Sequence, residues 1–320
     1  SSSWVVALKM RDRDCLHRFM FEQYPIRGHL VHLDAAWRAL TLHREYPAAI
    51  RDTLGEAVAA SLLLAATVKF EGVLSLQLQG DGPVHLMLAQ CTGGLGVRGL
   101  ARYREGVYRS EGTGTDTSAE RIVDLIGAGN LTVTLETDDG AQRYQGIVPI
   151  AGQRLAESLQ IYFENSEQLP TRLWLHADAL GVSGMLLQKL PVANAPLGAE
   201  AVDAAAVDDA WRRVQLIGET LTPEELQTLA DADILHRLFN EDDVRLFEPA
   251  PVYFRCRCSR ERVSRMLQSL GDAETRSVLA ERGEVEVRCD FCNRAYVFDA
   301  VDVAQLFNTG APSDSGSSVH

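Results

Sequence analysis

The chain has 320 residues, of which 46% are hydrophobic and 23% are charged, and its formal net charge is −13. This composition is typical of a globular protein with two or three domains and excludes a disordered or fibrous chain. The negative charge argues against a general nucleic-acid or anionic-membrane binder, because phosphate contacts need clustered Lys and Arg side chains. We therefore expect neither nucleic acid nor membrane among its partners.

No segment has the length of a membrane-spanning helix. The longest apolar run, residues 57–68, is shorter than the roughly 20 residues that a span requires. Residues 1–8 are too few for the apolar core of a signal peptide, and charges follow at Lys9 and Arg11. The expected compartment is therefore the cytoplasm, where thiols stay reduced.

Residues 1–197 predict a core domain with antiparallel sheets. Two runs, 74–79 and 131–136, alternate between apolar and polar side chains, as half-buried strands do. Each run is followed by a turn rich in Asp and Gly and by a second strand, at 84–89 and 144–150. Because hairpins pair antiparallel neighbours, we expect one or two antiparallel sheets.

Helices are expected to pack on these sheets. The pattern Thr53-Leu-Gly-Glu56 is a capping box, which predicts a helix from Thr53 to about Phe70. Ala and Leu occupy nearly every face of that helix, so it should be buried on several sides. Residues 153–166 predict another helix that crosses a sheet. The fold class is therefore α+β.

Residues 198–253 are predicted to be a helical linker. Between 201 and 250 there are twelve acidic residues against four arginines and no lysine, a net charge of −8. Thr222-Pro-Glu-Glu225 is a helix start, and apolar residues recur at helical spacing. Two interpretations stay open: an ordinary connection packed on its neighbour, or a detachable segment whose apolar face can be uncovered. The residues of such a face would be Trp211, Leu216, Ile217, Leu235, Leu238 and Phe239.

Residues 254–308 are predicted to form a small C-terminal domain, and residues 309–320 a disordered tail. Glycines that stop helices and short apolar runs divide this domain into elements. In chain order we expect a helix at 259–270, a helix at 272–283, and strands at 284–288 and 296–298.

Four cysteines of this domain form two close pairs, Cys256-Arg-Cys258 and Cys289-Asp-Phe-Cys292. Two chelating loops with two thiolates each suit a tetrahedral Zn²⁺ ion with sulfur ligands at about 2.3 Å. A domain this small buries little apolar surface, so the metal would contribute folding free energy. We predict one Zn²⁺ per chain, bound by all four thiolates. Peroxides also oxidise thiolates, so both a redox switch and a static zinc site remain open.

These cysteine motifs resemble one family closely, the bacterial redox-regulated holdase chaperones known as the thirty-three-kilodalton heat-shock protein (HslO) family. The resemblance is carried by residues 254–262 and 287–298 and extends from about Asp14 to Phe307. In the first domain it includes Arg27-Gly28, Lys69-Phe-Glu-Gly72, Gln77-Leu-Gln-Gly-Asp-Gly-Pro83, Tyr144-Gln-Gly146, Ser166-Glu-Gln-Leu-Pro-Thr-Arg172 and Gly184-Met-Leu-Leu-Gln188.

The resemblance implies an α+β core, a helical linker and a C-terminal zinc domain. It implies a chaperone and not an enzyme, with no catalytic residue, that is inactive while reduced and zinc-bound. Oxidation would pair Cys256 with Cys258 and Cys289 with Cys292, release zinc, and unfold the zinc domain and linker. The protein would then form a homodimer and hold unfolding client proteins without ATP during oxidative and heat stress.

Other patterns carry less weight. The segment Gly94–Gly99 matches a dinucleotide fingerprint, but a strand is expected to follow it, so we interpret it as a glycine-rich loop. His29 and His32 lie three apart on an expected strand, and their opposite faces argue against joint metal binding. Cys15 and Cys91 are isolated and are interpreted as spare thiols.

Two other functions compete with the chaperone as interpretations of these motifs. A thiol–disulfide oxidoreductase would use Cys289 and Cys292, but this pair does not open a helix after a strand as in thioredoxin-like proteins. A zinc-ribbon adaptor for nucleic acids is opposed by the net charge of −13. The redox-switched chaperone remains the prediction.

Overall fold

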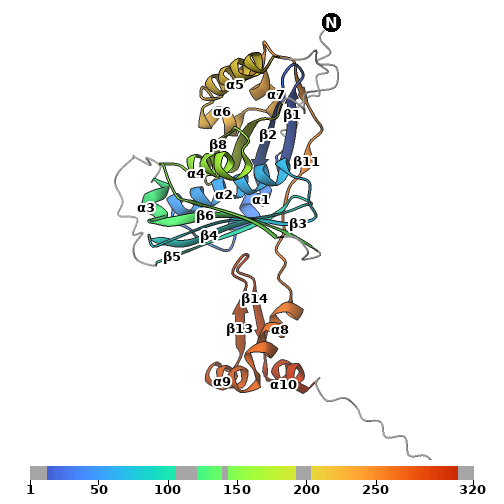
Figure 1. Cartoon of the computed structure of the whole chain (residues 1–320). Helices are drawn as coiled ribbons and strands as arrows, with labels where there is room; N and C mark the ends of the chain where they lie inside the picture. The colour runs from blue at the N-terminus through green and yellow to red at the C-terminus, as the bar shows by residue number, and fades with distance from the viewer. Residues whose placement is uncertain (1–12, 105–120, 139–142, 192–202, 309–320) are drawn as a thin grey trace, which may run out of the picture. The chain divides into compact units, whose positions relative to one another are not determined.

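The computed structural model describes residues 13–104, 121–138, 143–191 and 203–308. The chain divides into two compact units, with the boundary between Arg255 and Cys256 (Figure 1). The expected linker start at 198 and the expected tail at 309–320 lie outside the described residues. Within the described ranges, no helix is both long enough and apolar enough to cross a membrane.

The first unit contains two sheets of six strands each, called sheet A and sheet B. All their strand pairs are antiparallel except that of β12 with β5, so the predicted antiparallel sheets are confirmed. Sheet A has the order β10 (Val244–Leu246), β1 (Cys15–Phe21), β2 (Ile26–Leu33), β9 (Val182–Lys189) and β8 (Thr171–Ala177), with β11 (Ala250–Pro251) beside β1. Sheet B has the order β12 (Tyr253–Phe254), β5 (Gly96–Tyr103), β4 (Val84–Thr92), β3 (Gly72–Gly80), β6 (Gly129–Thr137) and β7 (Arg143–Pro149).

The two predicted hairpins are confirmed, and they form most of sheet B. Strands β3 and β4 pair with Leu78 opposite Met87, and β6 and β7 pair with Leu131 opposite Val148. The leucines of β3 are buried, as the alternation predicts. Strand β5 begins at Gly96, so no helix follows Gly94, as expected, but the predicted glycine-rich loop is wrong from Gly96 to Gly99, which lie within the strand.

Helix α2 (Ala48–Thr67) lies between the two sheets (Figure 1) and contacts strands of both. Its predicted burial on several sides is confirmed. The predicted start at Thr53 is wrong, because the helix begins directly after Pro47 and Thr53 lies inside it. The Thr53 hydroxyl donates to the carbonyl of Ala49 at 2.8 Å. A threonine can bond back to the preceding turn as well as cap a helix, so the pattern was ambiguous.

Shorter helices complete the first unit. The helix predicted at 153–166 is confirmed as α4 (Leu155–Tyr162), which continues into the π-helical turn η1 (Phe163–Glu167). Two further helices, α1 (Ala35–Thr41) and α3 (Ile122–Ile126), were not predicted.

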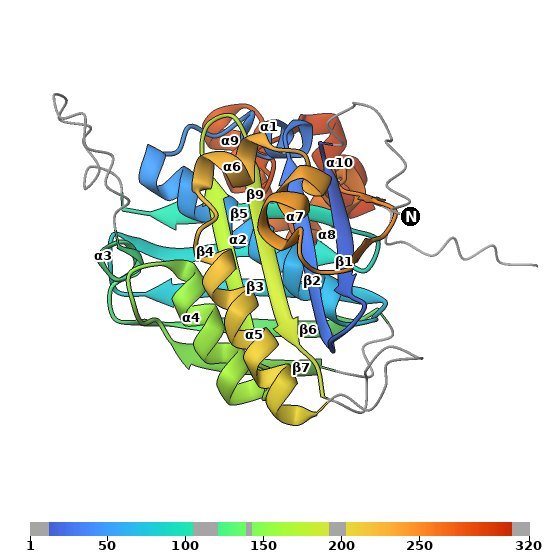
Figure 2. The ribbon, with the colours of Figure 1, turned by 90° about the horizontal axis from the view of Figure 1, so that it is seen from above.

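Three helices from the predicted linker cover the outer face of sheet A (Figure 2). The predicted start of the middle one is confirmed, since Thr222 and Glu225 form a reciprocal capping box. The helices predicted from the spacing of apolar residues in this segment are confirmed as well. They are called the linker helices: α5 (Ala204–Gly218), α6 (Pro223–Thr228) and α7 (Asp231–Phe239).

The linker helices and sheet A share one buried apolar cluster. It contains six buried residues from β1, β2 and β9 and nine from the linker segment. The ring of Phe239 on α7 meets that of Phe21 on β1 edge-on, with centroids 5.1 Å apart. At the end of α5, Gly218 lies so close to Trp174 of β8 that a Cβ atom would be 2.6 Å from the indole ring. The linker segment is therefore closely packed on the core.

The second unit contains the elements predicted for it and one more helix. Its core has six buried hydrophobic side chains, from both strands and two of the helices. Gly283, at a φ of 79°, ends its second helix. The elements are α8 (Arg260–Leu270), α9 (Asp272–Arg282), the hairpin of β13 (Val285–Arg288) and β14 (Ala295–Phe298), and the unpredicted α10 (Ala300–Asn308).

Candidate metal centre

The first cysteine pair lies directly before helix α8. Ser259 is the N-cap of this helix, and its side chain accepts a hydrogen bond from the N–H of Arg262 at 3.3 Å. Cys258 precedes the cap and Cys256 lies two residues earlier. Because the N-terminus of a helix carries partial positive charge, this position favours the thiolate form of Cys258.

The second pair lies in the turn between β13 and β14. The N–H of Cys289 donates to the carbonyl of Arg294 at 3.0 Å, and the N–H of Asn293 donates to the carbonyl of Cys289 at 2.8 Å. Asn293 has a φ of 54°, in the left-handed region that asparagine tolerates better than most residues. The turn that carries Cys289 and Cys292 is therefore fixed by its own backbone.

The four predicted thiols are brought together. Their sulfur atoms all lie within 4.8 Å of one another. The short contacts join the two loops, at 3.6 Å from Cys256 to Cys289 and at 3.4 Å from Cys258 to Cys292. A tetrahedral ion with sulfur ligands at about 2.3 Å needs sulfurs about 3.8 Å apart. No disulfide joins any of the six cysteines. The four thiols therefore fit a metal ion and could hold one.

The thiols differ in acidity. Burial raises the pKa of Cys256 and of Cys292. Burial acts on Cys258 in the same direction, but the hydroxyl of Tyr296 donates to its Sγ at 3.1 Å and, with the neighbouring thiols, lowers the pKa of Cys258 to about 7. The same hydrogen bond, together with burial, raises the pKa of Tyr296 to about 12. Cys258 is therefore partly a thiolate near neutral pH, the form that binds metals and reacts with oxidants.

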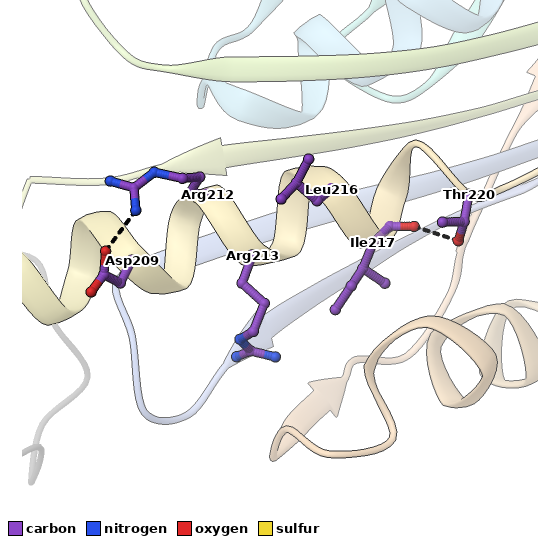
Figure 3. A pocket seen from close by; sticks show the side chains of 6 residues that line it. All are labelled: Asp209, Arg212, Arg213, Leu216, Ile217 and Thr220. Carbon is purple, nitrogen blue, oxygen red and sulfur yellow. Dashed lines mark hydrogen bonds and ion pairs between the residues drawn. The ribbon is translucent and has the colours of Figure 1, made fainter.

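The six apolar linker residues predicted to meet clients differ in exposure. Leu216 is 66% exposed and, with Ile217, lines an open groove on α5, where Asp209 pairs with Arg212 (Figure 3). The buried ones can meet another protein only if the linker helices leave sheet A. Four of the six are buried, namely Trp211, Leu235, Leu238 and Phe239. Ile217 is half-buried and Leu216 is exposed.

Polar contacts also hold the linker helices on the core. The Nε2 of Gln227 in α6 donates to Oδ1 of Asp178, which follows β8, at 2.8 Å. The Nε2 of His32 on β2 lies 2.6 Å from the carbonyl oxygen of Leu226 in α6. The docked state of α6 therefore depends on directed hydrogen bonds as well as on apolar contact.

The histidine prediction is confirmed, since the two side chains lie on opposite faces of β2. His32 reaches Asp231 of α7 at 2.8 Å, whereas His29 lies against the backbone of Ala66 in α2. Cys91 on β4 is buried, and burial raises its pKa to about 12, which makes it a poor nucleophile near neutral pH.

A second group of metal-binding side chains was not predicted. Cys15, His17 and Asp231 are buried and offer ligand atoms within 4.8 Å of one another. The alternation of Cys15 and His17 on one strand was visible in the sequence. Asp231 comes from α7, and only the packing of that helix on sheet A brings it to them.

Comparisons with known proteins cover nearly the whole chain. Residues 14–299 match the family model described as Hsp33 protein. The 33 kDa chaperonin of Nitrosococcus oceani is 45% identical over 311 residues, which are 97% of this chain and 100% of that protein. The 33 kDa chaperonin of Methylobacillus flagellatus is 44% identical, over 94% of this chain and 96% of that protein. That of Pseudomonas aeruginosa is 42% identical, over 96% and 99%.

A solved structure has the same fold. The crystal structure of the 33 kDa chaperonin from Thermotoga maritima aligns with a TM-score of 0.75 at 23% sequence identity, covering 93% of this chain and 99% of that chain. The family match spans both units and all four clustered cysteines. The chain therefore belongs to the Hsp33 family of chaperones.

Proposed function

We propose that this chaperone is a redox-regulated, ATP-independent holdase, inactive while reduced and zinc-bound and active after oxidation. The observation that carries the proposal is the set of four thiols within 4.8 Å in a unit with only six buried core hydrophobics. Metal–thiolate bonds in small modules contribute on the order of 10–16 kcal/mol of folding free energy. A unit that depends on such bonds unfolds when its sulfurs are oxidised.

Zinc is the proposed metal, with Cys256, Cys258, Cys289 and Cys292 as its ligands and one ion per chain at this four-cysteine centre. Four thiolates in a tetrahedral arrangement are the donor set of structural zinc sites. When bound, Zn²⁺ would cross-link the segment before α8 to the β13–β14 turn. The lowered pKa of Cys258 supports this assignment, because ligation requires the thiolate.

Oxidation is proposed to form disulfides Cys256–Cys258 and Cys289–Cys292. Each disulfide removes two electrons and two protons from a pair of thiols, and one hydrogen peroxide is reduced to two waters. The two disulfides consume all four ligands, so the unit loses its cross-link. The nearest sulfurs in the reduced state belong to different loops. Mass-spectrometric mapping of the disulfides is therefore the test of the pairing.

Unfolding of residues 254–308 is proposed to release the linker, residues 198–253, from the core formed by residues 1–197. The apolar cluster that the linker helices share with sheet A supports this step, because undocking would uncover side chains on both partners. Those surfaces would bind unfolding client proteins and favour a homodimer on oxidation. We place this activity in the cytoplasm under oxidative and heat stress, with no catalytic residue and with neither nucleic acid nor membrane as a partner.

The test measures client aggregation by light scattering with a heat-denatured enzyme. Zinc content and free thiols are counted in parallel, before and after mild peroxide treatment. We expect one zinc and four thiols of the C-terminal unit to be lost together as holding activity appears, and reductant with zinc to reverse both. Equal holding by the reduced, zinc-bound protein would contradict redox regulation. Cys91→Ser, at a buried thiol of sheet B, is the matched control and should behave as the wild type.

A further inference from the structure

The buried group on sheet A combines three kinds of metal-binding side chain. Cys15 and His17 are alternate residues of β1 and share one face of the strand. His32 of β2 is the cross-strand partner of Cys15, so it lies on the same face. Helix α7 packs over that face and begins at Asp231. The group therefore joins the core sheet to a linker helix.

Each carboxylate oxygen of Asp231 faces a ring nitrogen of a histidine. The side chain of Asp231 is 6% exposed, and Oδ1 lies 2.8 Å from Nδ1 of His32. Oδ2 lies 2.6 Å from Nδ1 of His17 and pairs with that ring when it is protonated, but beyond this ion pair no donor among the described residues gives it a hydrogen bond. A buried carboxylate oxygen without a hydrogen bond costs free energy, about 1–3 kcal/mol or more. A carboxylate oxygen of Asp231, a ring nitrogen of His17 and the Sγ of Cys15 lie within 4.8 Å of one another.

His32 holds the carboxylate in this orientation. Its Nε2 lies 2.6 Å from the carbonyl oxygen of Leu226, while its Nδ1 faces Oδ1 of Asp231. Both neighbours are acceptors, so His32 donates in both directions and fixes Oδ1. Ligating carboxylates in metal sites are commonly held by a second hydrogen bond of this kind. Oδ2 is then the oxygen that, together with the ring of His17, could bind a metal in place of their ion pair.

We propose that Cys15, His17 and Asp231 form a second metal site, for a divalent ion of the zinc class, which fastens α7 to sheet A. Thiolate, imidazole and carboxylate together suit Zn²⁺ or Co²⁺, whereas Mg²⁺ and Ca²⁺ prefer oxygen ligands alone. A thiolate and a carboxylate balance the charge of the ion, which buried groups require. A water molecule can complete a tetrahedron.

The site is independent of the four-cysteine centre and of redox regulation. It uses no residue of the C-terminal unit, and it stands if the proposed function fails. A metal here would raise the affinity of the linker helices for the core, because one ligand comes from α7 and two come from β1.

Metal counting in the full-length reduced protein tests the proposal. After saturation with Zn²⁺ and removal of loosely bound ions, we expect two equivalents in the wild type and in Cys91→Ser, but one in Cys15→Ser. Asp231→Asn keeps the size of the side chain and should also bind one, so it decides the matter if Cys15→Ser does not fold. One equivalent in the wild type, or equal counts in the wild type and both variants, would overturn the site and leave a plain ion pair.

A second measurement isolates the new site. In full-length protein with Cys256, Cys258, Cys289 and Cys292 all changed to serine, Co²⁺ should still give a thiolate charge-transfer band. Adding Cys15→Ser should abolish that band, and Co²⁺ should slow amide exchange in α7 at least tenfold only while Cys15 is present. Absence of the band in the four-serine protein would contradict the proposal.

Discussion

The linker helices and the C-terminal unit are stabilised in different ways. The linker helices share fifteen buried residues with sheet A, whereas the C-terminal unit has a core of six and places four thiols at metal-binding distance. The first arrangement depends on buried apolar area, which a change of redox state does not alter. In the proposed function the second depends on metal bonds to sulfur, which an oxidant attacks directly. The chain thus combines a unit whose proposed metal bonds are sensitive to oxidants with an apolar sheet face that helices cover.

The largest expected effect comes from removing the metal. A zinc chelator added to the reduced protein should unfold the C-terminal unit, because its small core cannot replace metal bonds on the order of 10 kcal/mol. Amide exchange should become fast throughout α8, α9 and the β13–β14 hairpin, while sheet B stays protected. Protection of α8 and α9 in the metal-free protein would show that the apolar core suffices and would remove the contrast between the two regions.

The next effect should come from the apolar contact of the linker. Phe239→Ala removes a buried ring that packs on Phe21, so we expect a loss of about 3–5 kcal/mol in unfolding free energy. Urea denaturation followed by tryptophan fluorescence measures it, since Trp211 lies in the same cluster. The exposed Leu216→Ala should change stability by less than about 0.5 kcal/mol. Equal effects of the two substitutions would mean that α7 is not docked as described.

A fall in pH should lower the stability of the first unit, which contains His29, more than that of the C-terminal unit. His29 is 1% exposed, and burial together with the charges of Arg27 and Arg18 lowers its pKa to about 3. The unfolded chain therefore takes up a proton below pH 6.5 that the folded first unit does not bind. The stability contributed by neutral His29 is present above pH 6.5 and is lost as the pH falls toward 3. Between pH 7 and pH 5 the loss is about 2 kcal/mol.

Urea denaturation at several pH values measures this loss. In His29→Leu the total loss of unfolding free energy between pH 7 and pH 5 should be smaller by about 2 kcal/mol. The C-terminal unit serves as the internal control, because residues 256–308 contain no histidine. An unchanged loss of unfolding free energy in the variant would show that His29 is not the group that titrates.

The smallest expected effect concerns the hydroxyl of Tyr296. Tyr296→Phe keeps the ring but removes the hydrogen bond to Cys258, worth about 0.5–1.5 kcal/mol, so the pKa of Cys258 should rise. Zinc release by peroxide at pH 7 should then slow several-fold. Tyr253→Phe, on sheet B of the first unit, is the matched control and should leave the rate unchanged. A faster release in Tyr296→Phe would assign the hydroxyl a protective role instead.

Much of the fold follows from local patterns. The alternation of Leu74, Leu76 and Leu78 predicted β3, and the Thr222–Glu225 capping box predicted the start of α6. The four-cysteine site was also predictable, because spacing within two short loops limits where the sulfurs can go. Local chemistry and the final structure agree in these places.

The remaining features depend on packing between residues distant in the chain, which sequence patterns do not reveal. The start of α2 was misplaced because Thr53 has a capping pattern but bonds back to Ala49 within the helix. Strand pairing placed Cys15 opposite His32, and docking of α7 added Asp231. No local pattern encodes the contact of residues so distant in the chain, so this buried group emerged only from the structure.

The close approach of Gly218 to Trp174 has a consequence for engineering the molecule. Any larger residue at position 218 would have to displace the indole or lift α5 from β8, since a single added carbon already overlaps the ring. Such a substitution acts by steric pressure alone and leaves every cysteine untouched. A substitution at position 218 could therefore uncover the surface of sheet A permanently, even under reducing conditions and without any oxidation of thiols.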